Sequence, residues 1–189
     1  MISKIITPID IIMYLASIIY YNKNELYCCL RYIKYIDMSH ANHLRENIKS
    51  LLYCNKPRLY PMIFEYYSAI ELTKRLGRPF FVYEDFSPSI KASNGFPVQD
   101  KGIDLIDTSL SIVGQCKYYS NKSTITYGKL STFLASDKLV GKKLEYYLIR
   151  TDECKLDSLV QKMIDRGEMY DIKIYKEEFI ENLKTINKE

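Results

Sequence analysis

The sequence has no tryptophan, and it has only seven glycines, six prolines and two histidines among its 189 residues. No glycines have the spacing of an ATPase loop that holds phosphate, which excludes a motor activity encoded in this chain. No serine, histidine and aspartate, nor any cysteine and histidine, suggest a nucleophilic triad. The absence of tryptophan beside 18 tyrosines indicates the codon usage of an AT-rich genome.

Long hydrophobic runs are also missing. The apolar stretch from Ile5 to Tyr21 is interrupted by Pro8 and Asp10 and is shorter than the ~20 residues of a membrane-spanning helix. It lacks a small-residue cleavage site, so it is interpreted as a buried helix. The five cysteines are odd in number, which favours free thiols and a reducing compartment. We therefore expect an intracellular protein, of the cytoplasm or nucleus, without membrane association.

What the sequence does contain fits a folded domain with a small appendage. Hydrophobic residues make up 47% and charged residues 26% of the chain, which is typical of a soluble fold with a sizeable core. The net charge of +4 fits a polyanionic partner but does not require one.

Periodicity divides the chain near residue 58. Residues 1–58 have apolar side chains at helical spacing and end in the polar Asn55-Lys56-Pro57-Arg58, so they are predicted as a helical N-terminal appendage. In residues 59–189 the expected order is helix 61–76, strand 79–86, loop 87–101, strands 102–107 and 111–119, helix 123–136, strand 144–150, helix 156–166, strand 170–175 and a final helix. This order predicts an α/β core with a mixed β-sheet flanked by helices.

The two central strands carry the chemically informative residues. Asp104 stands in Gly-Ile-Asp-Leu, and Gln115 and Lys117 follow on the next strand in Gln-Cys-Lys. Because side chains alternate along a strand, Gln115 and Lys117 are expected on one face and Cys116 on the other. The strand pair can thus bring a carboxylate, an amide oxygen and an ammonium group together.

Cleavage of a phosphodiester bond uses these groups. Asp104, the Gln115 side chain and the Cys116 backbone carbonyl offer oxygen ligands for Mg²⁺ or Mn²⁺. Such an ion activates water and polarises the phosphate. Lys117 can orient the water and neutralise the charge that develops on the phosphate.

At these residues the sequence resembles the PD-(D/E)XK nuclease superfamily, in particular its Mrr-like restriction endonuclease branch. The resemblance covers residues 62–150 and includes Phe64-Glu65, Gly102-Ile103-Asp104-Leu105, Gln115-Cys116-Lys117 and Ser131-Thr132-Phe133. It implies a restriction-endonuclease-like fold. It also implies that Glu65 assists metal binding from the first helix, that Asp104 bridges the metal and that Lys117 is the motif lysine. Similar domains occur at the N-terminus of large restriction and viral helicases, which makes a helicase domain or subunit an expected partner.

Gln115 departs from the family pattern, in which most members have Asp or Glu; the Mrr-like branch accepts Gln. The expected function is metal-dependent hydrolysis of DNA, with Glu65, Asp104, Gln115 and Lys117 as catalytic residues. A homodimer would suit cleavage of both strands. The neutral Gln115 keeps open a catalytically inactive nucleic-acid-binding module on the same fold. A protein-interaction module working through residues 1–58 is a third alternative.

Two further groups of residues allow a functional or a structural interpretation. Lys122 and Lys129 are expected to contact DNA phosphates, while Tyr118 and Tyr119 can either stack on bases or pack in the core. Cys28, Cys29, His40, His43 and Cys54 are close in sequence but match no zinc-finger or zinc-ribbon spacing, so buried cysteines and surface histidines are expected and a zinc site is the alternative.

Overall fold

The computed structural model describes residues 39–53, 57–99, 101–119 and 123–186. Contacts within the chain define two compact units, Met1–His40 and Ala41–Glu189. The helices predicted within residues 1–35 lie outside the described residues. The second unit contains the sheet and almost all of the described helices.

A five-stranded mixed sheet forms the centre of this unit, in the order β1-β2-β3-β5-β7. The first three strands pair antiparallel, whereas β5 and β7 run parallel to β3. The strands are β1 (Phe80–Val82), β2 (Leu105–Asp107), β3 (Ile112–Lys117), β5 (Glu145–Thr151) and β7 (Tyr170–Ile174). β3 therefore pairs antiparallel with β2 on one side and parallel with β5 on the other.

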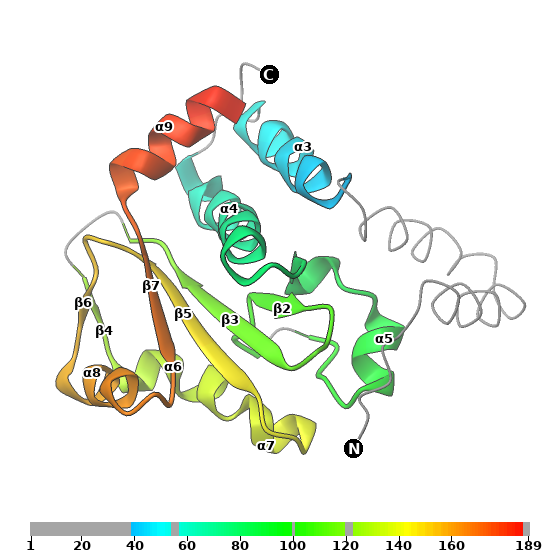
Figure 1. Ribbon diagram of the computed structural model, residues 1–189, viewed down its shortest axis with the longest axis vertical. Helices are drawn as coiled ribbons and strands as arrows, with labels where there is room; N and C mark the ends of the chain where they lie inside the picture. The colour runs from blue at the N-terminus through cyan, green and yellow to red at the C-terminus, as the bar shows by residue number, and fades with distance from the viewer. Residues whose placement is uncertain (1–38, 54–56, 100, 120–122, 187–189) are drawn as a thin grey trace, which may run out of the picture. The chain divides into compact units, whose positions relative to one another are not determined.

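Helices cover both faces of the sheet (Figure 1). One face carries α3 (Ser39–Tyr53), α4 (Tyr60–Leu76) and α9 (Lys176–Ile186), and the other carries α6 (Tyr127–Leu134), α7 (Ser136–Val140) and α8 (Ser158–Asp165). The helices α6 to α8 belong to the crossovers that the parallel strands need. The remaining elements are the 3₁₀ turns η1 (Pro57–Leu59) and η2 (Tyr83–Asp85), helix α5 (Pro88–Ser93), and a small parallel sheet of β4 (Thr124–Ile125) and β6 (Lys155–Leu156).

The main hydrophobic core lies between the sheet and the helices α3, α4 and α9. Phe64 from α4 meets Phe179 from α9 edge-on, with ring centroids 5.4 Å apart. Leu44 and Ile48 of α3 are buried in the same cluster. The compact unit therefore takes in α3 and begins earlier than the core predicted for residues 59–189.

The predicted α/β order, with helix, three strands, helix and strand in the middle, is confirmed. The boundaries differ in several places. The strand predicted at 102–107 begins only at Leu105, so Asp104 precedes β2 and does not stand on it. The strand predicted at 79–86 ends at Val82, where a 3₁₀ turn begins, and the loop predicted at 87–101 contains α5. The helix predicted at 123–136 is split into β4, α6 and α7.

Helix α4 is explained by local sequence signals. Pro61 lies in its first turn, where a missing N–H costs nothing. Gly77 ends it in the left-handed conformation, at φ 63°, and its N–H donates to the Thr73 carbonyl. The face between these ends is apolar and buried, so α4 lies flat on the sheet beside β1 and β3.

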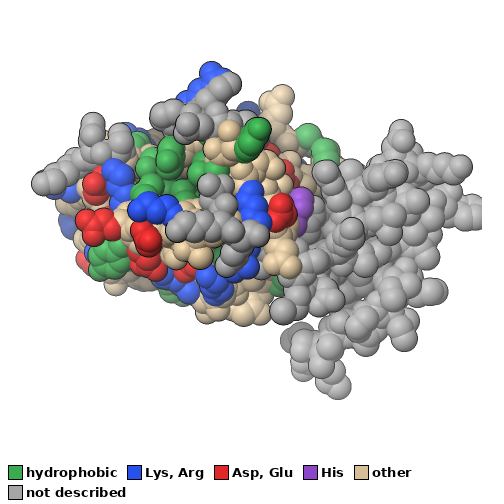
Figure 2. Space-filling model, turned by 90° about the horizontal axis from the view of Figure 1, so that it is seen from above, with side chains coloured by type: hydrophobic (Ala, Val, Ile, Leu, Met, Phe, Trp, Pro, Cys, Tyr) green, Lys and Arg blue, Asp and Glu red, His purple; other side chains and the backbone are tan. Residues whose placement is uncertain are grey.

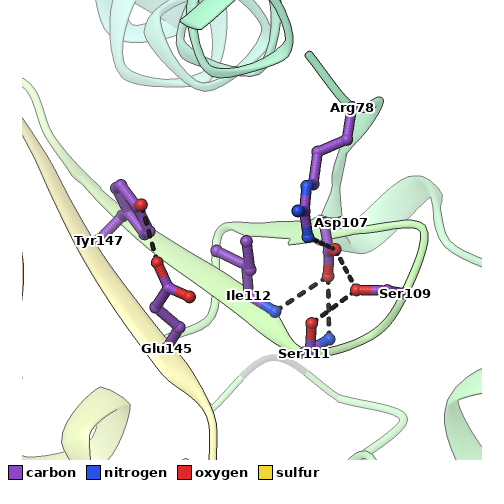
Figure 3. A network of polar contacts seen from close by, with 7 residues as sticks. All are labelled: Arg78, Asp107, Ser109, Ser111, Ile112, Glu145 and Tyr147. Atoms are coloured by element: carbon purple, nitrogen blue, oxygen red, sulfur yellow. Dashed lines mark hydrogen bonds and ion pairs between the residues drawn. The ribbon is translucent and has the colours of Figure 1, made fainter. Parts of the chain in front are cut away.

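A buried carboxylate holds the turn between β2 and β3 (Figure 3). Asp107 accepts hydrogen bonds from the backbone N–H groups of Ser111 and Ile112, both at 2.9 Å, and from the Ser109 hydroxyl. The Arg78 guanidinium lies 3.5 Å from the same carboxylate. The turn includes Leu110 at φ 59°, a conformation that L-residues rarely adopt, so the Asp107 contacts stabilise an otherwise unfavourable connection.

One carboxylate, that of Asp157, caps two helices. It accepts hydrogen bonds from Leu159 N and Val160 N at the start of α8, and from Tyr127 N at the start of α6. The N–H of Val160, followed by those of Tyr127 and Leu159, holds the pKa of Asp157 below its ordinary value of 3.8, against a smaller opposing effect of burial. The ionised carboxylate is therefore favoured in the folded state.

We expect Asp157→Ala to lower the melting temperature at pH 7 by on the order of 5 °C. Because the folded pKa is depressed, this stabilisation is present above the unfolded pKa and is lost as pH falls through the folded pKa. Thermal unfolding between pH 7 and pH 2.5 should thus show the two proteins converging at acidic pH. Asp157→Asn keeps a capping oxygen and should lie between them. A constant difference at all pH values would contradict the capping role.

Candidate functional site

The predicted site residues lie where β2 and β3 separate, at the carboxyl end of β3. The last paired residues are Leu105 opposite Gly114. Beyond this pair, Asp104 N donates to Gly114 O at 2.9 Å, and Asp104 Oδ2 accepts from Cys116 N at 2.6 Å. The Asp104 side-chain oxygen thus accepts the N–H of Cys116, which a backbone carbonyl of β2 would accept if the two strands stayed paired. This contact fixes the Asp104 carboxylate beside the peptide bond between Gln115 and Cys116.

The side chains of β3 alternate between the two faces of the sheet. Cys116 packs against the core on the α4 face. Gln115 lies on the opposite face, next to Gly102 and α6. A Cβ atom added at Gly102 would be 3.3 Å from Gln115 Nε2 and 3.3 Å from Phe133 N of α6. Lys117, two residues after Gln115, is on that face as well. It is half-buried, in register with Arg150 of β5.

The Gln115 side chain is enclosed but not fully hydrogen-bonded. It is only 6% exposed, and its Oε1 has no hydrogen-bond partner among the described residues. A buried amide oxygen without a donor is costly. Gly102, at φ 89°, leaves the space that the Gln115 amide occupies. The arrangement holds an acceptor oxygen in place that a cation or a donor from outside the chain could satisfy.

A small pocket beside Asp104 collects carboxylates from separate elements. Its volume is ≈ 100 Å³. It is lined by Met62, Glu65, Tyr83, Glu84, Ile103 and Asp104. Glu65 and Asp104 thus share one pocket, whereas Gln115 and Lys117 do not line it. Glu84 falls within the strand predicted at 79–86 and is not among the predicted site residues. Its position shortly after the apolar residues of β1 is the feature of the sequence that could have identified it.

The environment of Cys116 links Glu65 and Asp104 to β3. Burial raises the pKa of the Cys116 thiol well above its ordinary value, and the carboxylates of Asp104 and Glu65 add to this effect. The Ser68 hydroxyl and the Lys117 ammonium act in the opposite direction. Two carboxylates and one ammonium therefore influence the pKa of the central residue of the Gln-Cys-Lys segment.

The donor set suits a hard divalent cation only if amide and carbonyl oxygens take part. In the described part of the chain, no three His, Cys, Asp or Glu side chains are clustered as a metal site. Glu65 and Asp104 offer carboxylates in one pocket, whereas the neutral Gln115 Oε1 is buried on the other face of the sheet and would have to turn to reach it. Because Gly114 O points toward β2, the Cys116 carbonyl, two residues on, points to the same edge. These are the oxygen ligands that Mg²⁺ and Mn²⁺ accept.

Of the two lysines expected to contact DNA, Lys122 lies outside the described residues. Lys129 is exposed on α6, and its Nζ donates to the Thr124 carbonyl at 2.8 Å. The same ammonium lies 5.1 Å from the centroid of the Tyr119 ring. Since Tyr119 is two residues after Lys117, Lys129 lies close to the end of β3.

The alternative zinc site receives no support from the described residues. Cys28, Cys29 and Cys54 lie outside them, as does the His40 side chain. His43 Nε2 and Asn47 Nδ2 are 3.0 Å apart on α3, one helical turn from each other. Across the described ranges, no helix is both long and apolar enough to cross a bilayer.

Comparisons with protein-family models, curated proteins and solved structures give no match for this chain.

Proposed function

We propose that the chain is a Mg²⁺- or Mn²⁺-dependent endonuclease that hydrolyses DNA phosphodiester bonds, on a restriction-endonuclease-like core of the PD-(D/E)XK type. One observation carries the proposal. The Asp104 carboxylate is bonded to the amide of Cys116, between Gln115 and Lys117, at the point where two strands part. The carboxylate thus contacts the backbone amide that lies between the residues carrying the side-chain amide and the amine.

The order of elements supports the same proposal. A helix bearing Glu65 precedes three antiparallel strands, and a crossover helix leads to a strand parallel to the third. The residues that carry the family resemblance fall on or next to α4, β2, β3 and α6 of this arrangement. Ligand sites in open α/β sheets commonly lie outside the carboxyl ends of strands, and Lys117 ends β3 beside the hydrogen bond between Asp104 and Cys116.

Each residue would have a distinct role in the reaction. Glu65, Asp104 and the Cys116 carbonyl would hold the cation, which when bound lowers the pKa of a water molecule and offsets phosphate charge, and Gln115 would join these ligands after its side chain turns from the α6 face. Asp104 also keeps β3 in position through its bond to Cys116 N. Lys117 would orient the attacking water and neutralise charge that develops on the phosphate oxygens.

Supercoiled plasmid tests this function directly. The full chain, with Mg²⁺ or Mn²⁺, should nick the plasmid, and chelation with EDTA should stop the reaction. Asp104→Ala and Lys117→Ala should remove the activity, while Lys138→Ala, an exposed lysine on α7, should keep it. Nicking that survives in both site variants would point to a contaminating nuclease and overturn the proposal.

A catalytically inactive nucleic-acid-binding module remains the second candidate, because the neutral Gln115 removes a charge from the ligand set. We expect Gln115→Glu to lower the metal concentration needed for half-maximal cleavage several-fold, since an added carboxylate strengthens binding of a hard cation. A Mg²⁺ titration of the cleavage rate measures this shift, with Gln161→Glu, an exposed glutamine of α8, as the matched control. DNA binding without cleavage in both parent and Gln115→Glu would favour the inactive module.

A further inference from the structure

The end of β3 carries two neighbouring tyrosines in different environments. Tyr118 is surrounded by rings, with centroid distances of 6.0 Å to Tyr60, 5.5 Å to Phe64 and 5.7 Å to Phe179. It therefore belongs to the core on the α4 side. Tyr119 is half-buried, and no other aromatic ring stacks on it among the described residues. Aromatic packing thus explains the placement of Tyr118 but not that of Tyr119.

Lys129 of α6 lies over the Tyr119 ring, and a second tyrosine of α6 is exposed. The Lys129 ammonium is 5.1 Å from the Tyr119 ring centroid, a cation–π distance. Tyr127, two residues before Lys129, is 42% exposed at the start of α6. The end of β3 and the start of α6 therefore carry a half-buried tyrosine, a lysine over its ring and an exposed tyrosine. Aromatic rings beside basic groups are typical of proteins that bind unpaired nucleotides by stacking.

The face of the sheet opposite to α6 offers no broad basic surface among the described residues. Glu84 and Asp85 are exposed just after β1, and Asp152 is exposed after β5. In the view from above, basic and acidic side chains are interspersed over the face of α3 and α9 (Figure 2). A duplex bound on that face would bring its two phosphate backbones against interspersed carboxylates, at a cost in binding free energy. A single strand needs a narrower basic path.

We propose that the nucleic acid held at this site is a single-stranded polynucleotide, with one base stacked on Tyr119 and an adjacent phosphate neutralised by Lys129. The inference rests on the proposed nuclease function only for the cleavage step after binding. In that function, Lys129 and Tyr119 bind the polynucleotide so that its neighbouring phosphate lies toward Lys117. Stacking and phosphate contacts of this kind read no sequence, so the site should accept many sequences.

Binding in EDTA separates this inference from cleavage. Fluorescence anisotropy of the full chain should show tighter binding to labelled single-stranded DNA or RNA of about 20 nucleotides, a length that exceeds the site of one binding fold, than to the matching duplex. Tyr119→Ala should weaken single-strand binding by about 5- to 100-fold, and Tyr119→Phe should restore it. The control is Tyr170→Ala, which removes a tyrosine that is 48% exposed and stacks on Tyr147 at the amino end of β7.

Lys129 gives an independent measurement. Lys129→Ala should weaken binding and reduce the slope of log affinity against log salt by about 0.7, as expected for one lost phosphate contact on a single strand. Lys138→Ala should change neither. Melting temperatures identify variants that fail to fold, and Tyr119→Leu then replaces Tyr119→Ala because it keeps more of the side-chain volume.

The outcomes distinguish the two proposals. Preferred binding of the duplex, or single-strand binding unaffected by Tyr119→Leu and Lys129→Ala, overturns the inference and leaves the nuclease proposal standing. Single-strand binding that depends on Tyr119, without cleavage in any metal, supports the inference and overturns the nuclease proposal. A preference between the DNA and RNA strands identifies the sugar that the site accepts.

Discussion

Asp104→Asn should slow metal-dependent plasmid cleavage by at least about 100-fold while leaving the fold intact. The asparagine keeps an oxygen that can accept the hydrogen bond from Cys116 N, so the geometry between β2 and β3 is retained. What disappears is the negative charge that would hold a divalent cation beside the phosphate. Rates under single-turnover conditions at saturating Mg²⁺ measure the effect on the chemical step.

Asp171→Asn is a suitable control for this change. Asp171 is also a partly buried carboxylate on a strand of the same sheet, where it forms an ion pair with Arg150 at 2.8 Å. Its replacement should lower stability without abolishing cleavage by the remaining folded protein. If Asp104→Asn cleaves at the parental rate, or if both variants lose activity in proportion to their loss of folded protein, Asp104 has no catalytic role.

The largest effect on stability is expected from Asp107→Ala. This carboxylate is fully buried, and its removal leaves the N–H groups of Ser111 and Ile112 without acceptors and Arg78 without its partner. Each lost acceptor for a buried donor costs about 1–3 kcal/mol, so the free energy of unfolding should fall by about 3–5 kcal/mol. This is a large part of the stability of a typical domain. Urea unfolding followed by circular dichroism measures the change.

Asp107→Asn should be milder, because both N–H groups donate to Oδ1, whose place the amide oxygen can take; only Ser109 and Arg78 lose their partner Oδ2. Ser109→Ala removes only one hydroxyl from the exposed side of the same network and should cost about 1 kcal/mol or less. A loss for Asp107→Ala as small as that for Ser109→Ala would mean that water replaces the carboxylate in the turn.

The sequence predicted best those elements whose signals are local and repeated. Pro61 and Gly77 bracket α4, and the apolar run before Lys117 predicts β3. Helix α5 was missed because its six residues, Pro88–Ser93, contain too few apolar positions to show helical periodicity. The break between α6 and α7 was missed because it depends on a tertiary contact, in which the Tyr146 hydroxyl from β5 accepts from Asp137 N.

The candidate site shows the same division. Alternation along β3 was sufficient to predict that Cys116 and Gln115 face opposite sides of the sheet. The bond from Cys116 N to Asp104 depends on where β2 stops pairing, which no spacing in the sequence reveals. Glu84 enters the pocket beside Asp104 only because the chain turns into a 3₁₀ helix after Val82. Pairing of Tyr119 with Lys129 likewise depends on the placement of α6.

The Asp157 carboxylate couples the stability of the first turn of α6 to that of the first turn of α8. Because the same two oxygens accept from Tyr127, Leu159 and Val160, neither helix can fray from its N-terminus without weakening the other. Hydrogen exchange at these three amides should therefore occur in one common opening event. Any motion that draws Lys129 toward or away from the end of β3 would have to carry α8 with it.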